Sequence, residues 1–207
     1  MELTAATLWL NTVFSGFDQS VTLAIHSLYD MAGGFFTPFF EFISILGYAG
    51  IPLIIFAFML TLFKKSRRVG LAMLIALAFG ALVTNVFVKV YVARPRPYLN
   101  EFYRELWLLV GQNTEHDFCF PSGHTTAAFA FSVSGFICMK NKRKGFWILF
   151  FGPLMAVSRI YLVVHYPSDI LGGIVIGSVA AVIGWYVTSK LPESVYIYEL
   201  KKPKKAA

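Results

Sequence analysis

Long apolar runs dominate this sequence. Of its 207 residues, 57% are hydrophobic and 14% are charged, and the mean hydropathy is +0.65. A run of about 20 apolar residues is the length that a helix needs to cross a bilayer, and it is too long for a barrel strand. We therefore predict an all-α, polytopic transmembrane helical bundle that forms a single domain, 1–207. Five runs carry this prediction: 42–63, 70–90, 122–139, 145–164 and 170–189.

The first 41 residues contain no Lys or Arg, although they contain acidic residues such as Asp18. We predict one or two amphipathic helices here, near the outer membrane interface and packed against the bundle. The alternative is a sixth span within 4–29, which Asp18 disfavours because a carboxylate in the middle of a span is costly. The predicted domain thus has N-terminal helices (1–41), a helical core (42–190) and a basic tail (191–207).

The basic residues predict the orientation in the membrane. They form three clusters, at 64–68, 140–144 and 201–205, and five alternating spans place all three on one side. Basic loops favour the cytoplasm, so we predict a multi-pass protein of the cell membrane with a cytoplasmic C-terminus. The linker 91–121 and the turn 165–169 then face outward. The net charge of +7 lies in these short loops, which disfavours nucleic acid as a partner.

The segment SRIYLVVHYPSD, 158–169, has the most unusual polarity in the chain. Ser158, Arg159 and His165 are spaced so that they can lie along one helix face. Pro167 ends that helix, and the next helix begins with Asp169 in its first turn, beside the histidine. Charged groups at a membrane helix end are costly, so we predict a functional site here.

Two further segments are predicted to end at the same outer rim. The sequence KVYVARPRP, 89–97, stops a helix with two X-Pro steps and leaves Lys89, Arg94 and Arg96 near the surface. Such a cationic cluster suits a phosphate-like oxyanion. For Arg94 alone, we interpret the side chain as part of a snorkelling basic belt.

The sequence FPSGHTT, 120–126, opens the helix predicted over 122–139. Ser122 suits the N-cap, and Gly123 lets the backbone approach a ligand closely. The free N–H groups of this first turn, with the helix dipole, favour an anion. His124 is predicted to point into the same site, which adds a titratable group to it.

Together the three segments resemble the motifs of the type 2 phosphatidic acid phosphatase (PAP2) superfamily, in its membrane lipid phosphatase branch. Each motif position is present, in order, and the resemblance covers about 51–190. Because of the motif's spacing, Arg96 rather than Arg94 corresponds to the phosphate ligand. The matching residues are Lys89 and Arg96-Pro97, then Pro121–His124, then Ser158-Arg159, His165 and Asp169.

The resemblance implies a metal-independent lipid phosphatase that works through a phosphohistidine and needs no cofactor. His165 would be the nucleophile, Asp169 would orient its ring, and His124 would protonate the leaving group and then activate water. It also implies which residues bind the substrate phosphate: Lys89, Arg96, Ser122, Gly123 and Arg159. Around the rim, the aromatic residues Tyr98, Tyr103, Trp107 and Tyr166 suit a headgroup-level belt, and the charged tip 115–117 suits a small lid.

Several functions share these motifs. The substrate is expected to be a lipid in the bilayer, either a polyprenyl diphosphate such as undecaprenyl diphosphate or a glycerolipid phosphate such as phosphatidate. A lipid-dependent phosphotransferase is the main alternative. A non-catalytic anion transporter is less favoured, because no internal repeat is present, and five spans argue against a soluble haloperoxidase. The oligomeric state stays open.

Overall fold

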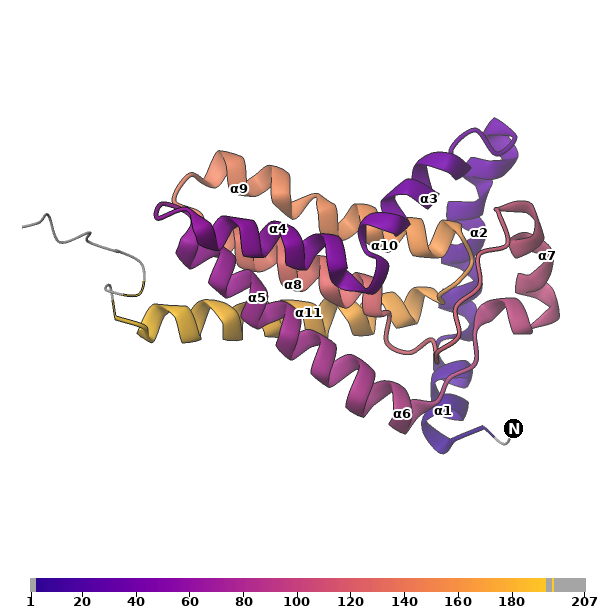
Figure 1. Cartoon of the computed structure of the whole chain (residues 1–207). Coiled ribbons are helices and arrows are strands. Elements are labelled where there is room, and N and C mark those ends of the chain that lie inside the picture. Colours follow the sequence, from indigo (N-terminus) through magenta and orange to yellow (C-terminus); the bar gives the residue numbers. More distant parts are fainter. Residues whose placement is uncertain (1–2, 193–194, 196–207) are drawn as a thin grey trace, which may run out of the picture.

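A helical bundle makes up most of the molecule, and one helix, α8, lies at its centre (Figure 1). The computed structural model describes residues 3–192 and 195, and within these it contains helices and no strand. This confirms the all-α prediction. Helix α8 packs against α5, α10 and α11. The helices of the bundle are α4 (Ile51–Leu62), α5 (Arg67–Ala81), α8 (Gly123–Cys138), α9 (Lys142–Leu149), α10 (Phe151–Tyr161) and α11 (Pro167–Lys190).

Glycines in α11 bring this helix close to the start of α8. A Cβ atom at Gly173 would lie 2.9 Å from the carbonyl oxygen of Ser122, and one at Gly177 would lie 2.5 Å from that of Thr126. Only glycine permits so close an approach of the two backbones. The first turn of α11, which carries Asp169, is thereby held beside the first turn of α8.

Three helical stretches are long and apolar enough to cross a membrane: Thr37–Leu62, Arg67–Leu99 and Pro167–Lys190. They correspond to the first, second and fifth predicted spans. The third predicted span is the shorter helix α8, with 16 residues, and the fourth is divided at Phe150 into α9 and α10. The full set of five spans therefore stays a prediction.

The first predicted span is not one continuous helix. It is divided into α3 (Thr37–Leu46), a 3₁₀ turn (Tyr48–Gly50) and α4. Ala49 and Gly50 have φ values of 48° and 68°, in the left-handed region that interrupts a right-handed helix. Pro52 in the first turn of α4 then starts a new helix. The apolar run conceals this bend because hydropathy does not report backbone conformation.

The second predicted span ends as expected. Helix α5 continues through a π-helical segment (Leu82–Val88) into α6 (Lys89–Val92). Ala93 then adopts a left-handed conformation, with φ of 52°, and the two X-Pro steps follow in extended conformation. A short 3₁₀ turn (Pro97–Leu99) leads into α7 (Glu101–Leu109).

The N-terminal helices α1 (Ala5–Val13) and α2 (Ser15–Ala32) run across the end of the bundle at which α7 also lies (Figure 1). Helix α2 is not among the three stretches that are long and apolar enough to span a membrane. Asp18, in its first turn, is buried. The predicted boundary at residue 41 falls inside α3, so the N-terminal segment and the core are joined by a helix.

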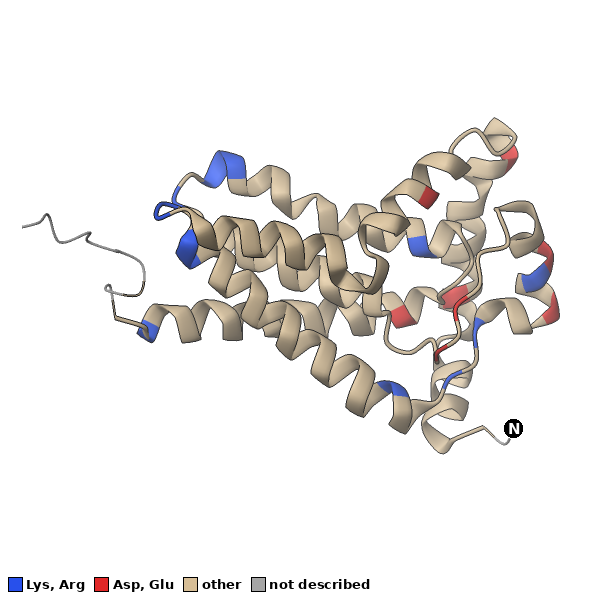
Figure 2. Ribbon diagram, viewed as in Figure 1, with Lys and Arg blue, Asp and Glu red and all other residues tan. Residues whose placement is uncertain are grey.

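In the described part of the chain, acidic residues lie toward one end of the bundle, whereas basic residues lie at both ends (Figure 2). The basic clusters 64–68 and 140–144 lie at one end, and the acidic residues lie toward the other end, around α7. This agrees with the predicted placement of these two clusters on one side. The third basic cluster, 201–205, lies outside the described residues. Which side of a membrane each end faces stays a prediction.

Candidate active site

All three motifs meet at the acidic end of the bundle, around a cavity of about 400 Å³. Lys89 comes from α6, Arg96 from the extended segment after it, and His165 from the turn between α10 and α11. Gly123 and His124 come from the first turn of α8 and also line the cavity. The structure thus brings together side chains that the sequence predicted would share one rim.

His165 lies in a tight, buried turn, in which Val163 has a φ of 54°. The imidazole Nε2 is 2.9 Å from Nη1 of Arg96. A guanidinium can only donate hydrogen bonds, so Nε2 accepts this one and the ring proton is on Nδ1. Nδ1 faces Oδ2 of Asp169 at 3.5 Å, which is longer than a hydrogen bond. The Nε2 lone pair of His165 is therefore directed at the guanidinium of Arg96, which is one of the predicted phosphate ligands.

Burial and positive charge keep the His165 imidazole unprotonated. Desolvation is the larger cause, and the charges of Arg96, Arg159 and Lys89 add to it, so that the pKa of His165 lies well below its usual value. A neutral imidazole at neutral pH is the nucleophilic form.

Asp169 is completely buried, and both of its oxygens have partners. Oδ2 accepts a hydrogen bond from the backbone N–H of Tyr166 at 2.9 Å, and Oδ1 accepts one from Nη1 of Arg94 at 2.7 Å. Arg94 is 1% exposed. The interpretation of Arg94 as a snorkelling residue is therefore wrong, because buried carboxylates replace water as its partners.

Ser122 caps α8, as predicted, but it does not line the cavity. Its Oγ accepts hydrogen bonds from the backbone N–H and the hydroxyl of Thr125, at 3.3 and 3.0 Å. Its own N–H donates to the carbonyl of Asp169 at 3.1 Å, which ties α8 to α11. Gly123 lies next to the Lys89 side chain, since a Cβ atom at Gly123 would be 3.7 Å from Nζ of Lys89.

The bend between α3 and α4 forms one wall of the site. Gly47, Tyr48, Ala49 and Gly50 line the cavity, and a Cβ at Gly47 would lie 2.8 Å from Cδ2 of His124. Sequence reasoning missed this wall, because it treated 42–63 as one straight span. The signal that was available is the spacing of two glycines before Pro52.

Two carboxylates bind the cations that are predicted to bind phosphate. Asp117 accepts from both Lys89 and Arg96, and Glu115 accepts from Arg159. Burial alone would raise the pKa of Asp117, but hydrogen bonds and charge from Lys89 and Arg96 outweigh it and hold that pKa below its usual value. These carboxylates have the charge and the hydrogen-bonding character of a phosphate oxygen.

The sequence profile of the PAP2 superfamily matches residues 69–193. The chain belongs to the PAP2 superfamily. The resemblance predicted from the three motifs is thus confirmed, and with it the prediction of a PAP2-type enzyme at the level of the family.

Curated PAP2 relatives share about a third of the aligned residues. The chain is 31% identical to an undecaprenyl-diphosphatase of Sulfolobus acidocaldarius over 122 residues, 58% of this chain and 55% of the relative. It is 34% identical to the undecaprenyl-diphosphatase BcrC of Bacillus subtilis over 106 residues, 51% of this chain and 50% of the relative. The chain therefore spans about half the length of these relatives.

Two solved structures share the fold. A transmembrane PAP2-type phosphatidylglycerolphosphate phosphatase of Bacillus subtilis has a TM-score of 0.70 at 22% identity, over 90% of this chain and 92% of the other. LpxE of Aquifex aeolicus has a TM-score of 0.63 at 23% identity, over 81% and 94%. The prediction of a helical membrane protein is confirmed by this likeness and by the three long apolar helices.

The loop that carries the two carboxylates lies between the first and second motifs, and aromatic residues of the preceding 3₁₀ turn and of α7 hold it. The Tyr98 hydroxyl donates to the carbonyl of Glu115 at 2.8 Å, and Trp107 Nε1 donates to that of Asn113 at 2.9 Å. The other two aromatic residues of the predicted belt, Tyr103 and Tyr166, are buried against each other. Tyr98 and Trp107 are half-buried and hold the loop, whereas Tyr103 and Tyr166 belong to the protein interior.

The cations have further partners that the sequence did not indicate. Arg159 donates to the Ser44 hydroxyl of α3 as well as to Glu115. Arg96 also donates to the carbonyl of Val164 at 2.9 Å, which fixes it against the histidine turn. Among residues 3–192 and 195, no three His, Cys, Asp or Glu side chains are grouped so that they could hold a metal ion.

Proposed function

We propose that this PAP2 protein is a metal-independent lipid phosphatase that removes a phosphate or diphosphate from a membrane lipid through a phosphohistidine. One observation carries the proposal: Nε2 of His165 accepts a hydrogen bond from Arg96 at 2.9 Å, at a cavity that Lys89 and His124 also line. A neutral nucleophile thus lies among cations that suit the equatorial oxygens of a transferring phosphoryl group.

The proposed reaction begins when the substrate phosphate replaces the carboxylates of Glu115 and Asp117 at the cations and takes over the hydrogen bond that Arg96 donates to Nε2 of His165, which frees the Nε2 lone pair. Nε2 of His165 then attacks phosphorus while His124 protonates the leaving oxygen. The phosphorylated ring is an imidazolium, which the charge of Asp169 beside Nδ1 stabilises. His124 next takes a proton from water, which attacks phosphorus, and His165 leaves as neutral imidazole.

The cavity supports a lipid as the substrate. Besides its charged residues, the cavity is lined by apolar or small residues of α4, α5 and α8: Ile54, Leu77, Gly80, Ala81 and Ala127. Curated relatives include undecaprenyl-diphosphatases and phosphatidylglycerophosphatase B of Bacillus subtilis, to which the chain is 29% identical over 136 residues. We favour a polyprenyl diphosphate, and a glycerolipid phosphate is the other substrate class to test.

We further propose five membrane spans, with the site on the extracytoplasmic side and α1 and α2 in the interface above it. The position of the basic clusters 64–68 and 140–144, at the end of the bundle opposite the site, supports this orientation (Figure 2). Helices α1 and α2 cross the bundle end rather than running along it (Figure 1), as interfacial helices do.

The proposed function is tested by phosphate release from purified protein in detergent, with a chelator present. The panel contains undecaprenyl diphosphate, phosphatidylglycerophosphate and phosphatidate. We expect release from at least one of them and inhibition by vanadate, which resembles the phosphoryl transition state. Transfer of labelled phosphate to a lipid acceptor instead of water would identify a phosphotransferase, and binding without turnover of any substrate would contradict the proposal.

Asp117→Asn is expected to strengthen the binding of anions to the site. The wild-type carboxylate competes for Lys89 and Arg96, and an amide of the same shape competes less because it has no charge. We expect the inhibition constants of inorganic phosphate and vanadate to fall about tenfold, equivalent to about 1.4 kcal/mol. The matched control is Glu105→Gln, which removes an exposed carboxylate from α7. Equal inhibition constants in wild type and Asp117→Asn would show that the carboxylate does not compete.

A further inference from the structure

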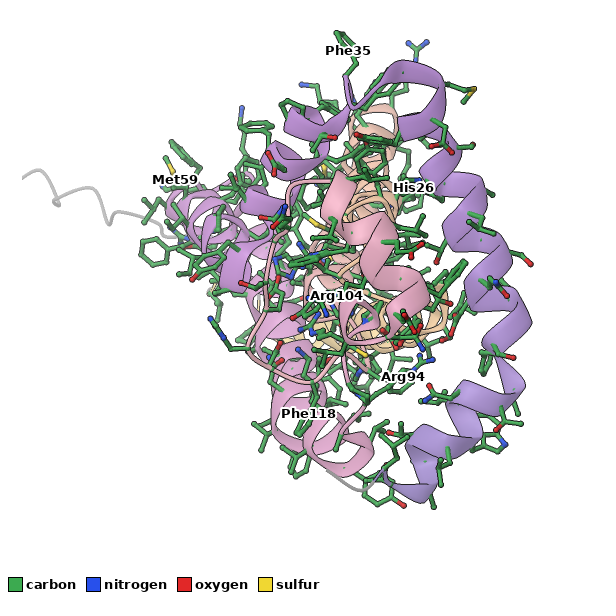
Figure 3. The ribbon with its side chains drawn as sticks, turned by 90° about the vertical axis from the view of Figure 1, so that its right-hand side faces the viewer. His26, Phe35, Met59, Arg94, Arg104 and Phe118 are labelled. Carbon is green, nitrogen blue, oxygen red and sulfur yellow. The ribbon has the colours of Figure 1, made fainter. Side chains whose placement is uncertain are left out.

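A buried cluster of charge lies directly behind Asp169. Its centre is Arg94, which donates to Oδ1 of Asp169 at 2.7 Å and to Oδ2 of Asp18 at 2.9 Å. Asp18 comes from α2, which precedes in sequence the region 69–193 that the PAP2 profile covers. Arg94 and both carboxylates are 1% exposed or less. Figure 3, which views this end of the molecule, shows Arg94 between the bundle and the N-terminal helices.

The hydrogen bonds in the cluster fix the charge of each member. Arg94 also donates from Nε to Asn11 Oδ1 at 2.9 Å and from Nη1 to Ser168 Oγ at 2.8 Å. Asp18 accepts from the N–H and the hydroxyl of Ser168, at 2.7 and 2.8 Å, in addition to Arg94. The three hydrogen bonds to Asp18 all come from donors, and such hydrogen bonds stabilise the charged form of a carboxyl group.

The cluster therefore contains two negative charges and one positive charge. Arg94 alone, paired with Asp169, would neutralise the carboxylate that faces His165. Asp18 draws the same guanidinium from its other side, so that the three residues together keep a net charge of −1. Within the cluster, Oδ2 of Asp169 lies 3.5 Å from Nδ1 of His165. The His165 ring becomes a cation when it is phosphorylated.

We propose that Asp18 and Arg94 are positioning residues for the phosphohistidine step. Arg94 holds the Asp169 carboxylate in place, and Asp18 balances Arg94 so that Asp169 keeps its negative charge for the imidazolium. The N-terminal helix α2 is then part of the catalytic apparatus. The inference rests on the proposed phosphohistidine mechanism. It adds to that mechanism the two residues that hold the Asp169 carboxylate and preserve its negative charge.

Neither Asp18 nor Arg94 lines the cavity to which Lys89, Arg96 and Gly123 contribute. Their effect is therefore expected on the chemical step and not on substrate binding. Asp18→Asn keeps the shape of the side chain and removes one charge, which makes the cluster neutral. We expect kcat for phosphate release to fall about tenfold, the equivalent of one pKa unit in the stability of the imidazolium, while KM changes less than about twofold.

The matched control for Asp18→Asn is Thr7→Val. The buried Thr7 hydroxyl of α1 donates to the carbonyl of Val92 at 2.6 Å, so that valine removes a tether between the N-terminal helices and α6 without changing charge. Wild-type kcat is expected for Thr7→Val. A wild-type kcat for Asp18→Asn, or an equal fall in both variants, would overturn the proposal.

The double variant Asp18→Asn/Arg94→Gln separates charge balance from structural support. Removing both charges restores the net charge of −1 on Asp169, and the glutamine amide keeps a hydrogen-bond donor at position 94, so we expect kcat to recover above that of Asp18→Asn. If the two residues only held α2 in place, the double variant would be slower than Asp18→Asn, which would overturn the proposal. If the double variant does not fold, the kcat and KM of Asp18→Asn, compared with those of Thr7→Val, still decide whether the role of Asp18 is upheld or overturned.

Failure of this inference is distinct from failure of the proposed function. An inactive wild type, or an active His165→Ala variant, would refute the phosphohistidine mechanism itself. An active wild type and an inactive His165→Ala variant, together with an unchanged Asp18→Asn variant, would refute only the role of Asp18 and Arg94.

Discussion

Replacing His165 with alanine is expected to reduce phosphate release by at least about a thousandfold, because it removes the proposed acceptor of the phosphoryl group. Burial and the neighbouring cations hold the pKa of His165 well below its usual value, so the wild-type ring stays unprotonated as the pH falls. We therefore also expect the acidic limb of the wild-type kcat/KM profile to lie below about pH 6.5. Phosphate release from the active lipid, measured from pH 4 to pH 9, gives both results.

A suitable control is His116→Ala, which removes an exposed histidine from the loop beside the site and is expected to retain wild-type turnover. Asp169→Asn is expected to leave weak residual activity, because the nucleophile remains but loses its negative partner. Rapid quenching with labelled substrate should give an acid-labile, base-stable phosphoprotein in wild type and none in His165→Ala. Comparable turnover by His165→Ala would eliminate His165 as the nucleophile.

The parts of the site that follow from local sequence were predictable. Ser122 caps α8, the X-Pro steps stop α6, and Pro167 starts α11, all through backbone rules that act within a few residues. Since the same residues lie at helix ends, the side chains beside them were predicted to meet at one rim. The structure brings Lys89, His124 and His165 to one cavity.

The parts that depend on long-range pairing were not predictable. Arg94 and Arg96 are two residues apart in the same motif, and no periodicity tells which one faces the buried Asp18 of α2. An acidic residue in a segment without basic residues was a signal that Asp18 needed a distant partner, but it did not identify Arg94. Glu115 and Asp117 lie in an irregular loop, where sequence does not report which cations they contact.

The bend at Gly47–Gly50 shows the corresponding limit for the fold. Hydropathy predicted the apolar run 42–63 well, because burial in lipid depends on composition. The turn Tyr48–Gly50, in which Ala49 and Gly50 have positive φ values, instead packs against α8, a tertiary contact that composition does not report. The prediction of one continuous helix over 42–63 thus fails at the wall of the site. Departures from sequence-based rules are expected at functional sites.

His124→Gln is expected to have an effect that depends on the leaving group. Glutamine preserves much of the side-chain volume against Gly47 but cannot transfer a proton. For a lipid phosphate, whose leaving oxygen requires a proton, we expect turnover to fall about 10²- to 10⁴-fold. For p-nitrophenyl phosphate, whose phenolate leaves without one, the first step is expected to be nearly unaffected. Hydrolysis of the phosphohistidine still needs a base, so it becomes the slow step.

Stopped-flow measurement with p-nitrophenyl phosphate distinguishes these steps. His124→Gln should release a burst of about one nitrophenolate per active site, followed by slow turnover, and the phosphorylated protein should accumulate. The variant that also carries His165→Ala should show no burst, because the acceptor is missing. If His124→Gln slows both substrates equally and shows no burst, His124 acts in binding or in shaping the cavity, and the proton for the leaving group must come from another donor. A burst would assign the base role to His124, since only a step after phosphoryl transfer can then limit turnover, and a larger loss with the lipid than with p-nitrophenyl phosphate in the first step would assign the acid role.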